Sequence, residues 1–313
     1  MDFGMETGKR EAGFPEAPYG APVAPVSARR FGPTFLLCLA VLLTAVVVVV
    51  AKPLTAAAAS TRARAHPHAA AIRAARKVAQ VAPAVATSPN WSGYVVYAAS
   101  VNDGSFNQVS ASWTEPTVTC PHKNAWTLFW VGFDGWPASD RAVEQGGTSA
   151  QCTNGVPHYS AFYEMWPTMA VMPIFTVYPG DQIESSVVFS TDTQQFQITV
   201  TDSTPGHENV ATEFEACPEG VTCERTSAEW VAESPAHFNT NKWFPLADYG
   251  TMDFTSATVT NAQGESGPIS FPSQWEDSGI ERVAGGTKAL AKVSTLENSP
   301  LGSTFADTFQ LRK

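Results

Sequence analysis

The sequence predicts an all-β protein, an antiparallel β-sandwich, over residues 89–313 of the 313-residue chain. Three observations favour this fold class. Short segments rich in Val, Thr, Phe, Tyr and Trp recur from residue 90 onward, separated by turns of Gly, Pro, Asn and Asp. Some of these segments alternate apolar and polar residues with a period of two, as half-buried strands do. No alternation of strands with helices indicates a parallel sheet.

Five segments carry the strand pattern most clearly, and the last of them is residues 196–201. In the last of them Phe196, Ile198 and Val200 share one face, and the Gln and Thr residues between them share the other. Pro179-Gly180-Asp181 and residues 261–264 have the composition of turns. Many short strands at regular spacing are typical of a sandwich or a barrel. The predicted strands include residues 94–97, 109–113, 126–131, 183–189 and 196–201.

The first 88 residues differ from the rest in composition and charge. They carry a net charge of +6, and residues 89–313 carry −16, which together give the −10 of the whole chain. Residues 1–33 are rich in Pro, Ala and Gly and predict a disordered cytoplasmic tail. A body with so few Lys and Arg is a poor nucleic-acid binder, because phosphates are neutralised by basic side chains.

Residues 34–51 form an uncharged, mostly apolar run directly after Arg29 and Arg30. This run predicts a single N-terminal hydrophobic helix, either a signal peptide or an uncleaved transmembrane anchor. The preceding positive charge predicts that its N-terminal side stays in the cytoplasm. Both alternatives place residues 89–313 outside the cell, as a secreted or membrane-anchored, extracellular-facing domain. Residues 52–88 are basic and predict either a solvated linker or a propeptide of a zymogen.

Four of the five cysteines lie on the exported side, and the fifth, Cys38, lies inside the apolar run. An even number of exported cysteines favours disulfides. Their spacing is unlike the short knuckles of zinc sites. Cys217 and Cys223 can close a small loop, which leaves Cys120 to pair with Cys152.

Several common catalytic motifs are absent. The chain has no G-x-S-x-G nucleophile elbow, P-loop or dinucleotide fingerprint. His207-Glu208 begins like a zincin motif, but residue 211 is alanine, so the second metal ligand is missing. Asp277-Ser278-Gly279 occurs once, whereas aspartic peptidases need two such triplets.

Several stretches taken together resemble those of the glutamic peptidases, or eqolisins. The chain resembles a bacterial-type member of this family. These stretches occur in the family's order from about residue 90 to residue 254, with a looser tail to the C-terminus, and their order is more specific than any one of them. The stretches are NWSGYV (90–95), VSASWTEP (109–116), WVGFDG (130–135), EQGGT (144–148), YSAFYEMWP (159–167) and AEWVAE (228–233).

This resemblance implies a concanavalin-like or jelly-roll-like sandwich and an acid-acting endopeptidase with a Gln/Glu dyad. Glu233 is implied as the general base and acid that activates water, and Gln145 as the group that stabilises the oxyanion. The pair is chemically coherent in acid, where a histidine base is already protonated, while an amide does not titrate. Activity is therefore expected to be lost near neutral pH. The resemblance implies no cofactor and no metal ion, polypeptide substrates and a monomeric catalytic domain.

Four further residues are expected to support the dyad: Trp130, Asp134, Glu164 and Glu229. Glu229 and Glu233 share one face of a predicted strand, where like charges raise the pKa of one partner. The chain departs from the family pattern at Gly146, directly after the dyad glutamine, and at Phe162. Gly146 is expected to loosen the catalytic segment, and Phe162 to reshape the substrate site.

Two other functions remain open from the sequence. A lectin-like sandwich can bind carbohydrate through exposed aromatic side chains, because the fold does not determine the function. A glycosidase can use two carboxylates, such as those of Glu229 and Glu233.

Overall fold

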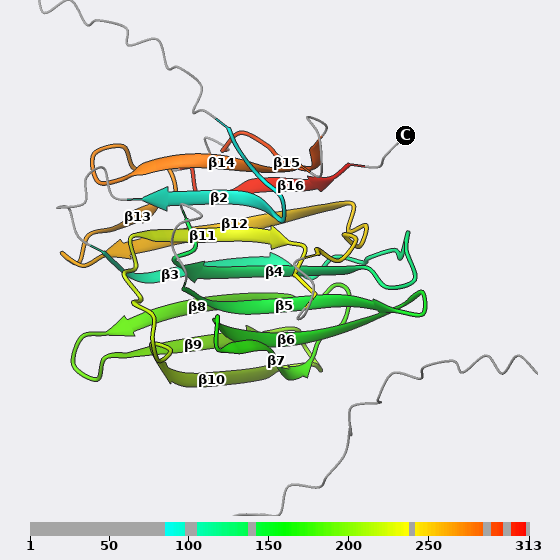
Figure 1. Cartoon of the computed structure of the whole chain (residues 1–313), viewed down its shortest axis with the longest axis horizontal. Coiled ribbons are helices and arrows are strands. Elements are labelled where there is room, and N and C mark those ends of the chain that lie inside the picture. The colour runs from blue at the N-terminus through cyan, green and yellow to red at the C-terminus, as the bar shows by residue number, and fades with distance from the viewer. Residues whose placement is uncertain are drawn as a thin grey trace, which may run out of the picture. The chain divides into compact units, whose positions relative to one another are not determined.

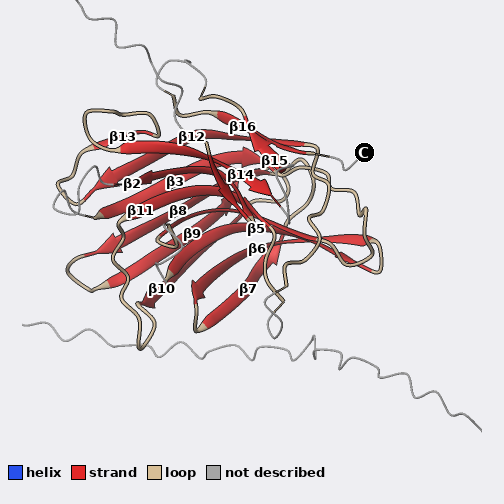
Figure 2. Cartoon of the chain, turned by 45° about the horizontal axis from the view of Figure 1, so that its top comes forward, coloured by secondary structure: helices blue, strands red, loops and turns tan. Residues whose placement is uncertain are grey.

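We describe the protein from a computed structural model, which defines residues 85–97, 105–136, 142–237, 242–283, 289–296 and 302–310. Every regular element in these ranges is a β-strand, which confirms the all-β prediction (Figure 2). The predictions for residues 1–33 and 34–51, and for residues 52–84 of the predicted linker or propeptide 52–88, lie outside the described residues. Residues 86–88 of that segment form a strand that pairs within the domain. Within the described ranges, no helix has the length and apolar character needed to cross a membrane.

The described chain contains sixteen strands, and they include all five segments predicted from the sequence. The strands are β1 (Ala86–Ser88), β2 (Trp91–Tyr97), β3 (Phe106–Thr114), β4 (Trp126–Phe133), β5 (Val143–Thr153), β6 (Val156–Trp166), β7 (Met169–Thr176), β8 (Gln182–Ser190), β9 (Gln195–Asp202), β10 (Asn209–Ala216), β11 (Ser227–Glu233), β12 (Thr251–Asn261), β13 (Ser266–Pro268), β14 (Glu276–Val283), β15 (Ala289–Val293) and β16 (Phe305–Phe309).

The strands pair in one continuous path, β10-β9-β8-β3-β12-β16-β15-β14-β2-β11-β4-β5-β6-β7. Every pair along this path is antiparallel, and the short β1 adds to β14 in parallel. Strand β12 joins the two layers of the sandwich, because its first half pairs with β16 and its second half with β3. The register of the β12–β3 pairing shifts between Thr255 and Thr258, near Ser256, whose φ is +53°. Such a bulge bends a strand and lets it leave one layer for the other.

The two layers lie face to face, with β4 and β5 of one layer against β3, β8 and β9 of the other (Figure 1). The main hydrophobic core fills the space between them. Phe196, Ile198 and Val200 of β9 are fully buried in this core, while Gln197 is exposed. The period-two prediction for this strand is therefore confirmed. Core residues come from both inner faces, as expected of two packed sheets.

Two disulfides connect the pairs that the cysteine spacing predicted. Cys120 is bonded to Cys152, and Cys217 to Cys223. The first joins the segment before β4 to β5, across 32 residues. A cross-link of this length is worth about 3–4 kcal/mol in the chain-entropy account, because it restricts the unfolded chain.

Candidate active site

The predicted dyad lies on a layer built from neighbouring strands in the order β2-β11-β4-β5-β6. In β4, Phe129, Val131 and Phe133 face the core between the layers. Leu128 and Trp130 face the opposite way and belong to a second, smaller apolar cluster. Strict alternation along the strand separates the two faces. The second face, which we call the site face, also carries Gln145, Glu164 and Glu233.

Gln145 lies in β5, where it is paired with Gly132 of β4 and with Glu164 of β6. Its Nε2 donates a hydrogen bond of 2.8 Å to Oε2 of Glu164. Its Oε1 is buried and accepts no hydrogen bond from a described residue. The side chain, 3% exposed, is thus held by one neighbour and keeps one N–H donor and one acceptor for other groups.

Glu233 ends β11, two strands from Gln145, and pairs with Trp91 of β2 and Leu128 of β4. Both of its carboxyl oxygens accept hydrogen bonds. Asn90 Nδ2 donates to Oε1 at 3.0 Å, and Trp130 Nε1 donates to Oε2 at 3.0 Å. These donors orient the carboxylate from both sides and favour its ionised form.

Trp130 lies in β4, between the strands of the two dyad residues, and pairs with Gly147 and Val231. Its ring packs edge-to-face on Trp91, with ring centroids 5.1 Å apart. A Cβ atom on Gly132 would lie 3.0 Å from the Gln145 Cβ and 3.1 Å from the Trp130 ring. The glycine of the W-V-G segment therefore lets the indole and the glutamine lie side by side.

The site face contains two carboxyl groups with strongly raised pKa values. Burial raises the pKa of Glu233 to about 7, although Asn90, Trp130, Trp91 and the charge of Arg282 lower it. Burial, and then the negative charge of Glu233, raise the pKa of Glu164 to about 8. Glu164, which accepts the hydrogen bond from Gln145, is therefore close enough to Glu233 for its pKa to respond to that charge.

The other two predicted supporting residues, Asp134 and Glu229, are both buried, at the end of β4 and in β11. Asp134 is buried after β4 with a φ of +67°, and its carboxylate accepts hydrogen bonds from the backbone N–H groups of Arg225 and Thr226. It ties the end of β4 to the segment that leads into β11. Glu229 is fully buried on the site face, opposite Gly132, four residues before Glu233. Both side chains remain predicted supporting residues.

The two departures from the family pattern lie in well-packed places. A Cβ atom on Gly146 would lie only 2.4 Å from Cγ2 of Ile198, so a core side chain already fills this space. Ser185 Oγ also donates a hydrogen bond of 2.8 Å to the Gly146 carbonyl. Gly146 is thus closely packed and hydrogen-bonded on its core side, and the expected loosening of the catalytic segment stays a prediction. Phe162 is fully buried in the apolar cluster of the site face.

Sequence reasoning missed three residues that act on Glu233: Asn90, Trp91 and Arg282. Asn90 and Trp91 were recognised only as parts of the NWSGYV stretch, with no role assigned. The sequence signal that could have identified Asn90 and Trp91 was their position as a polar–aromatic pair at the start of a predicted strand. Arg282 is buried in β14, and its charge lowers the pKa of Glu233. Nothing in the local sequence around Arg282 indicates this interaction.

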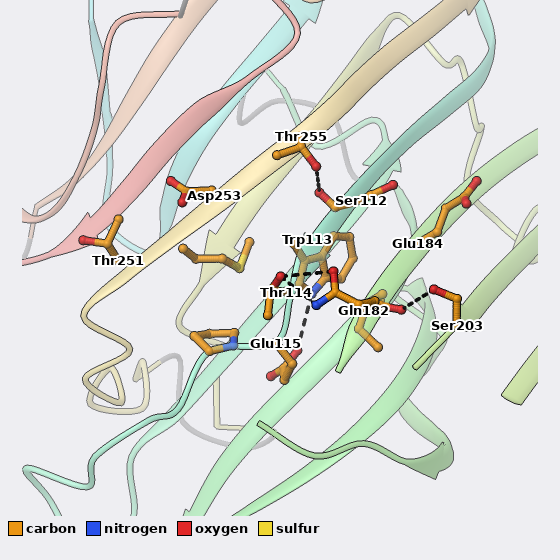
Figure 3. Close-up of a pocket in the computed structure, with 13 residues that line it drawn as sticks. Ser112, Trp113, Thr114, Glu115, Gln182, Glu184, Ser203, Thr251, Asp253 and Thr255 are labelled. Carbon is orange, nitrogen blue, oxygen red and sulfur yellow. Dashed lines mark hydrogen bonds between the residues drawn. The ribbon is translucent and has the colours of Figure 1, made fainter. Parts of the chain in front are cut away.

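A separate polar pocket of about 560 Å³ lies on the other layer, over β3, β8 and β12 (Figure 3). Hydroxyl groups of Ser112, Thr114 and Thr255 and carboxyl groups of Glu115, Glu184 and Asp253 contribute to its lining. Its single aromatic lining residue, Trp113, is 2% exposed. The pocket thus offers no open aromatic face on which a sugar ring could stack, and it contains neither dyad residue.

The chain matches the model of the peptidase A4 family over residues 89–300. It is similar to a solved structure of scytalido-glutamic peptidase with a peptide-based transition state analogue, with 23% identity and a TM-score of 0.56. It is also similar to SCP-B, a member of the eqolisin family of peptidases, in complex with the tripeptide Ala-Ile-His, with 22% identity and a TM-score of 0.57. Each comparison covers 71% of this chain and 99% of the other. No curated protein matches the chain.

Proposed function

The chain belongs to the peptidase A4 family and is a glutamic-type peptidase, and we propose that Gln145 and Glu233 form its catalytic dyad. The observation that carries this proposal is the arrangement on the site face. Glu233 is held by two hydrogen-bond donors, Gln145 is anchored by Glu164, and the charge of Glu233 acts on Glu164. Both residues of the pair are thus oriented by neighbours and belong to one electrostatic unit.

Glu233 acts as the base and then as the acid. Its ionised carboxylate takes a proton from water while the water oxygen attacks the carbonyl carbon of the scissile peptide bond. The protonated carboxyl then gives this proton to the leaving nitrogen as the carbon–nitrogen bond breaks. Glu233 returns to its ionised form, so the cycle consumes one water molecule and requires no other reactant.

The side-chain amide of Gln145 contacts the attacking water through its oxygen and the oxyanion through its nitrogen. Its Oε1, which accepts no hydrogen bond from a described residue, is an acceptor for the second proton of the attacking water. One N–H of Nε2 is used by Glu164, and the other is a donor for the negative oxygen of the tetrahedral intermediate. Glu164 fixes the amide in place, which lowers the cost of reorganising this donor during the reaction.

Gln145→Ala should lower kcat by about 10²–10³-fold, the usual effect of removing one oxyanion donor. The substitution removes an amide with one hydrogen bond to the protein, so folding should persist. Cleavage of a peptide substrate by the purified full chain checks the rate, and circular dichroism checks the fold. Gln197→Ala, at an exposed glutamine of β9, is the matched control and should cleave at the wild-type rate. Equal rates for the two variants would remove Gln145 from the dyad.

The pKa of Glu233 determines the expected pH dependence. The expectation of activity confined to acid used the ordinary glutamate value of about 4.3, whereas burial raises the pKa of Glu233 to about 7. With this value, only about one molecule in a hundred carries an ionised Glu233 at pH 5. If the ionised form is the base, kcat/KM should fall as the pH drops below about 7. A maximum in acid would show either that the pKa of Glu233 lies well below 7 or that its protonated form is the reactive one, and the pKa of Glu233 measured by titration distinguishes the two.

Asn90→Leu should move this acid limb to higher pH. The substitution removes the Nδ2 donor from Oε1 of Glu233, a hydrogen bond that lowers the pKa of the carboxyl. The variant should therefore lose more activity at pH 5 than at pH 8, relative to wild type. The measurement is kcat/KM between pH 4 and pH 9 for both proteins. An equal loss at every pH would show that Asn90 does not set the ionisation of the catalytic group.

The two alternative functions have less support. Residues four apart on a strand, such as Glu229 and Glu233, have backbone positions about 13 Å apart. Their carboxyl groups reach the separation of about 5–9.5 Å seen in glycosidases only if the two side chains turn toward each other. The like-charge neighbour that acts on Glu164 is Glu233, and Glu164 itself is engaged by Gln145. A carbohydrate module lacks an exposed aromatic platform in the pocket of the other layer.

We also propose that the peptidase domain is exported. The two disulfides support this location, since disulfides persist mainly in oxidising compartments outside the cytosol. Residues 34–51 are the proposed export signal or anchor, and residues 52–88 the proposed propeptide or linker. Detection of the domain in the medium, with an N-terminus after residue 51, would support cleavage. Retention of the intact chain in the membrane fraction would support anchoring.

A further inference from the structure

A second group of chemically reactive side chains lies away from the site face, at one end of β8 and β9. Asp181 ends the turn before β8, Asp202 ends β9, and His207 lies in the turn before β10. Pairing of Ile183 with Asp202 brings the two strand ends together. One possible ligand atom from each of the three side chains lies within 4.8 Å of the other two.

The contacts within this group leave one buried acceptor unused. Oδ2 of Asp181 accepts a hydrogen bond of 2.7 Å from the Tyr178 backbone N–H, and Oδ1 lies 2.7 Å from Nδ1 of His207. Oδ1 of Asp202 accepts a hydrogen bond from the Thr204 backbone N–H. Oδ2 of Asp202 is buried and has no hydrogen-bond partner among the described residues. The carboxyl group of Asp202 also interacts with that of Asp181.

Two adjacent carboxyl groups are stabilised either by a proton shared between them, as in the hydrogen bond between Asp202 and Asp181, or by a cation. Asp181 and Asp202 are each 2% exposed, and buried carboxylates are normally paired or bound to a cation. Among the described residues, the ion-pair partner of Asp181 is the exposed His207, and Asp202 forms no ion pair. His207 supplies at most one positive charge for two carboxylates. The cluster therefore has the charge and the free oxygen to accept a cation.

The donor set identifies the class of cation. Imidazole nitrogen suits zinc, copper, iron and nickel, and zinc also takes carboxylate oxygens, so one imidazole and two carboxylates with a water molecule fit a divalent transition metal. Calcium and magnesium prefer oxygen ligands alone. Ligands of zinc lie about 2.0–2.2 Å from the ion, and modest side-chain rotations bring atoms within 4.8 Å of one another to such a sphere.

We propose that Asp181, Asp202 and His207 form a binding site for a divalent transition-metal ion such as zinc. The ion would join the turn before β8 to the end of β9 and to the turn before β10. Gln182 and Ser203, the next residues after the two aspartates, line the polar pocket of Figure 3. The site is therefore placed to stabilise one wall of that pocket, and it takes no part in the dyad chemistry.

The test is zinc binding by the full chain after treatment with a chelator, in the wild type and in variants. ZnCl2 should raise the Tm of the wild type, and CaCl2 or MgCl2 at the same concentration should not. His207→Gln and Asp202→Asn should each weaken zinc binding at least about tenfold by calorimetry and lose the rise in Tm. His158→Gln, at an exposed histidine of β6, is the matched control and should bind as the wild type does.

Three outcomes would overturn the proposal. The wild type could bind no zinc, or both cluster variants could bind zinc as tightly as His158→Gln does. Calcium could also raise the Tm as much as zinc, which would show that the two carboxylates suffice and that the site is not selective for a transition metal. His207→Gln keeps the test independent of folding, because His207 lies exposed in a turn and its loss leaves the buried aspartates in place.

Discussion

Glu233→Gln should reduce kcat by about 10²–10⁴-fold, the contribution of a positioned general base. The amide has almost the shape of the carboxylate, so the substitution tests the charge and the proton transfer rather than the packing. One oxygen becomes an NH₂ group that faces either Asn90 Nδ2 or Trp130 Nε1. Asn90 can turn its own amide to present an oxygen instead, which limits the structural cost.

The measurement is peptide cleavage by the purified variant beside the wild type, with thermal unfolding as the test of folding. Glu184→Gln, an exposed glutamate of β8 on the other layer, receives the same chemical change and should cleave normally. Normal turnover by Glu233→Gln would show that Glu233 is not the general base. Loss of activity in both variants would mean that a Glu→Gln change at either position impairs the enzyme, and that the defect is not specific to Glu233.

The second large effect concerns stability, which should be higher at pH 4.5 than at pH 8. Four buried carboxyl groups have raised pKa values in the folded protein, with burial as the largest cause in each case. The pKa is about 7 for Glu115, Glu233 and Asp307 and about 8 for Glu164. In the unfolded chain these groups titrate near 4.

The sign follows from the proton count of the two states. Between about pH 4 and pH 8 the folded state holds more protons than the unfolded state, so the free energy of unfolding falls as the pH rises. Each pKa unit corresponds to about 1.4 kcal/mol, so a shift of about three to four units gives on the order of 4–5 kcal/mol for each group. The full stabilisation is present below about pH 4 and is lost as the pH passes through 7–8.

Thermal unfolding of the full chain at several pH values checks this expectation. Glu115→Gln should reduce the difference between the Tm at pH 4.5 and at pH 8, because the variant has one buried titrating group fewer. The exposed Glu184→Gln should leave the difference unchanged. A Tm at pH 8 equal to or above that at pH 4.5 would show that the four buried groups are ionised at little cost.

Much of the fold could be predicted because its signals are local. The alternation in Phe196, Ile198 and Val200 reports which side chains face the core, and no distant residue is needed to read it. The disulfide pairs followed from the number and spacing of the cysteines. The bend of β12 could not be predicted, because its bulge depends on pairing with β16 and β3, which lie on opposite sides of it in the sequence.

The sequence by itself determined the all-β class, the disulfide pairs and, through the resemblance, Gln145 and Glu233 as the candidate dyad. Tertiary structure decided which groups act on these two residues. Asn90 and Trp130 donate to Glu233 across 143 and 103 residues of chain. Glu233 raises the pKa of Glu164, which lies on another strand, whereas the sequence had drawn attention to Glu229 on the same strand.

The physical reason is that a pKa and a ligand cluster depend on distances in space. Burial and neighbouring charge, which raise the pKa values of Glu164 and Glu233, exist only when strands far apart in the sequence are paired. The proposed metal site has the same origin, since Asp181, Asp202 and His207 meet through the pairing of β8 with β9. The alternation of apolar and polar residues along a strand can be read from the sequence alone, whereas the electrostatics of a site depends on the register of its sheet.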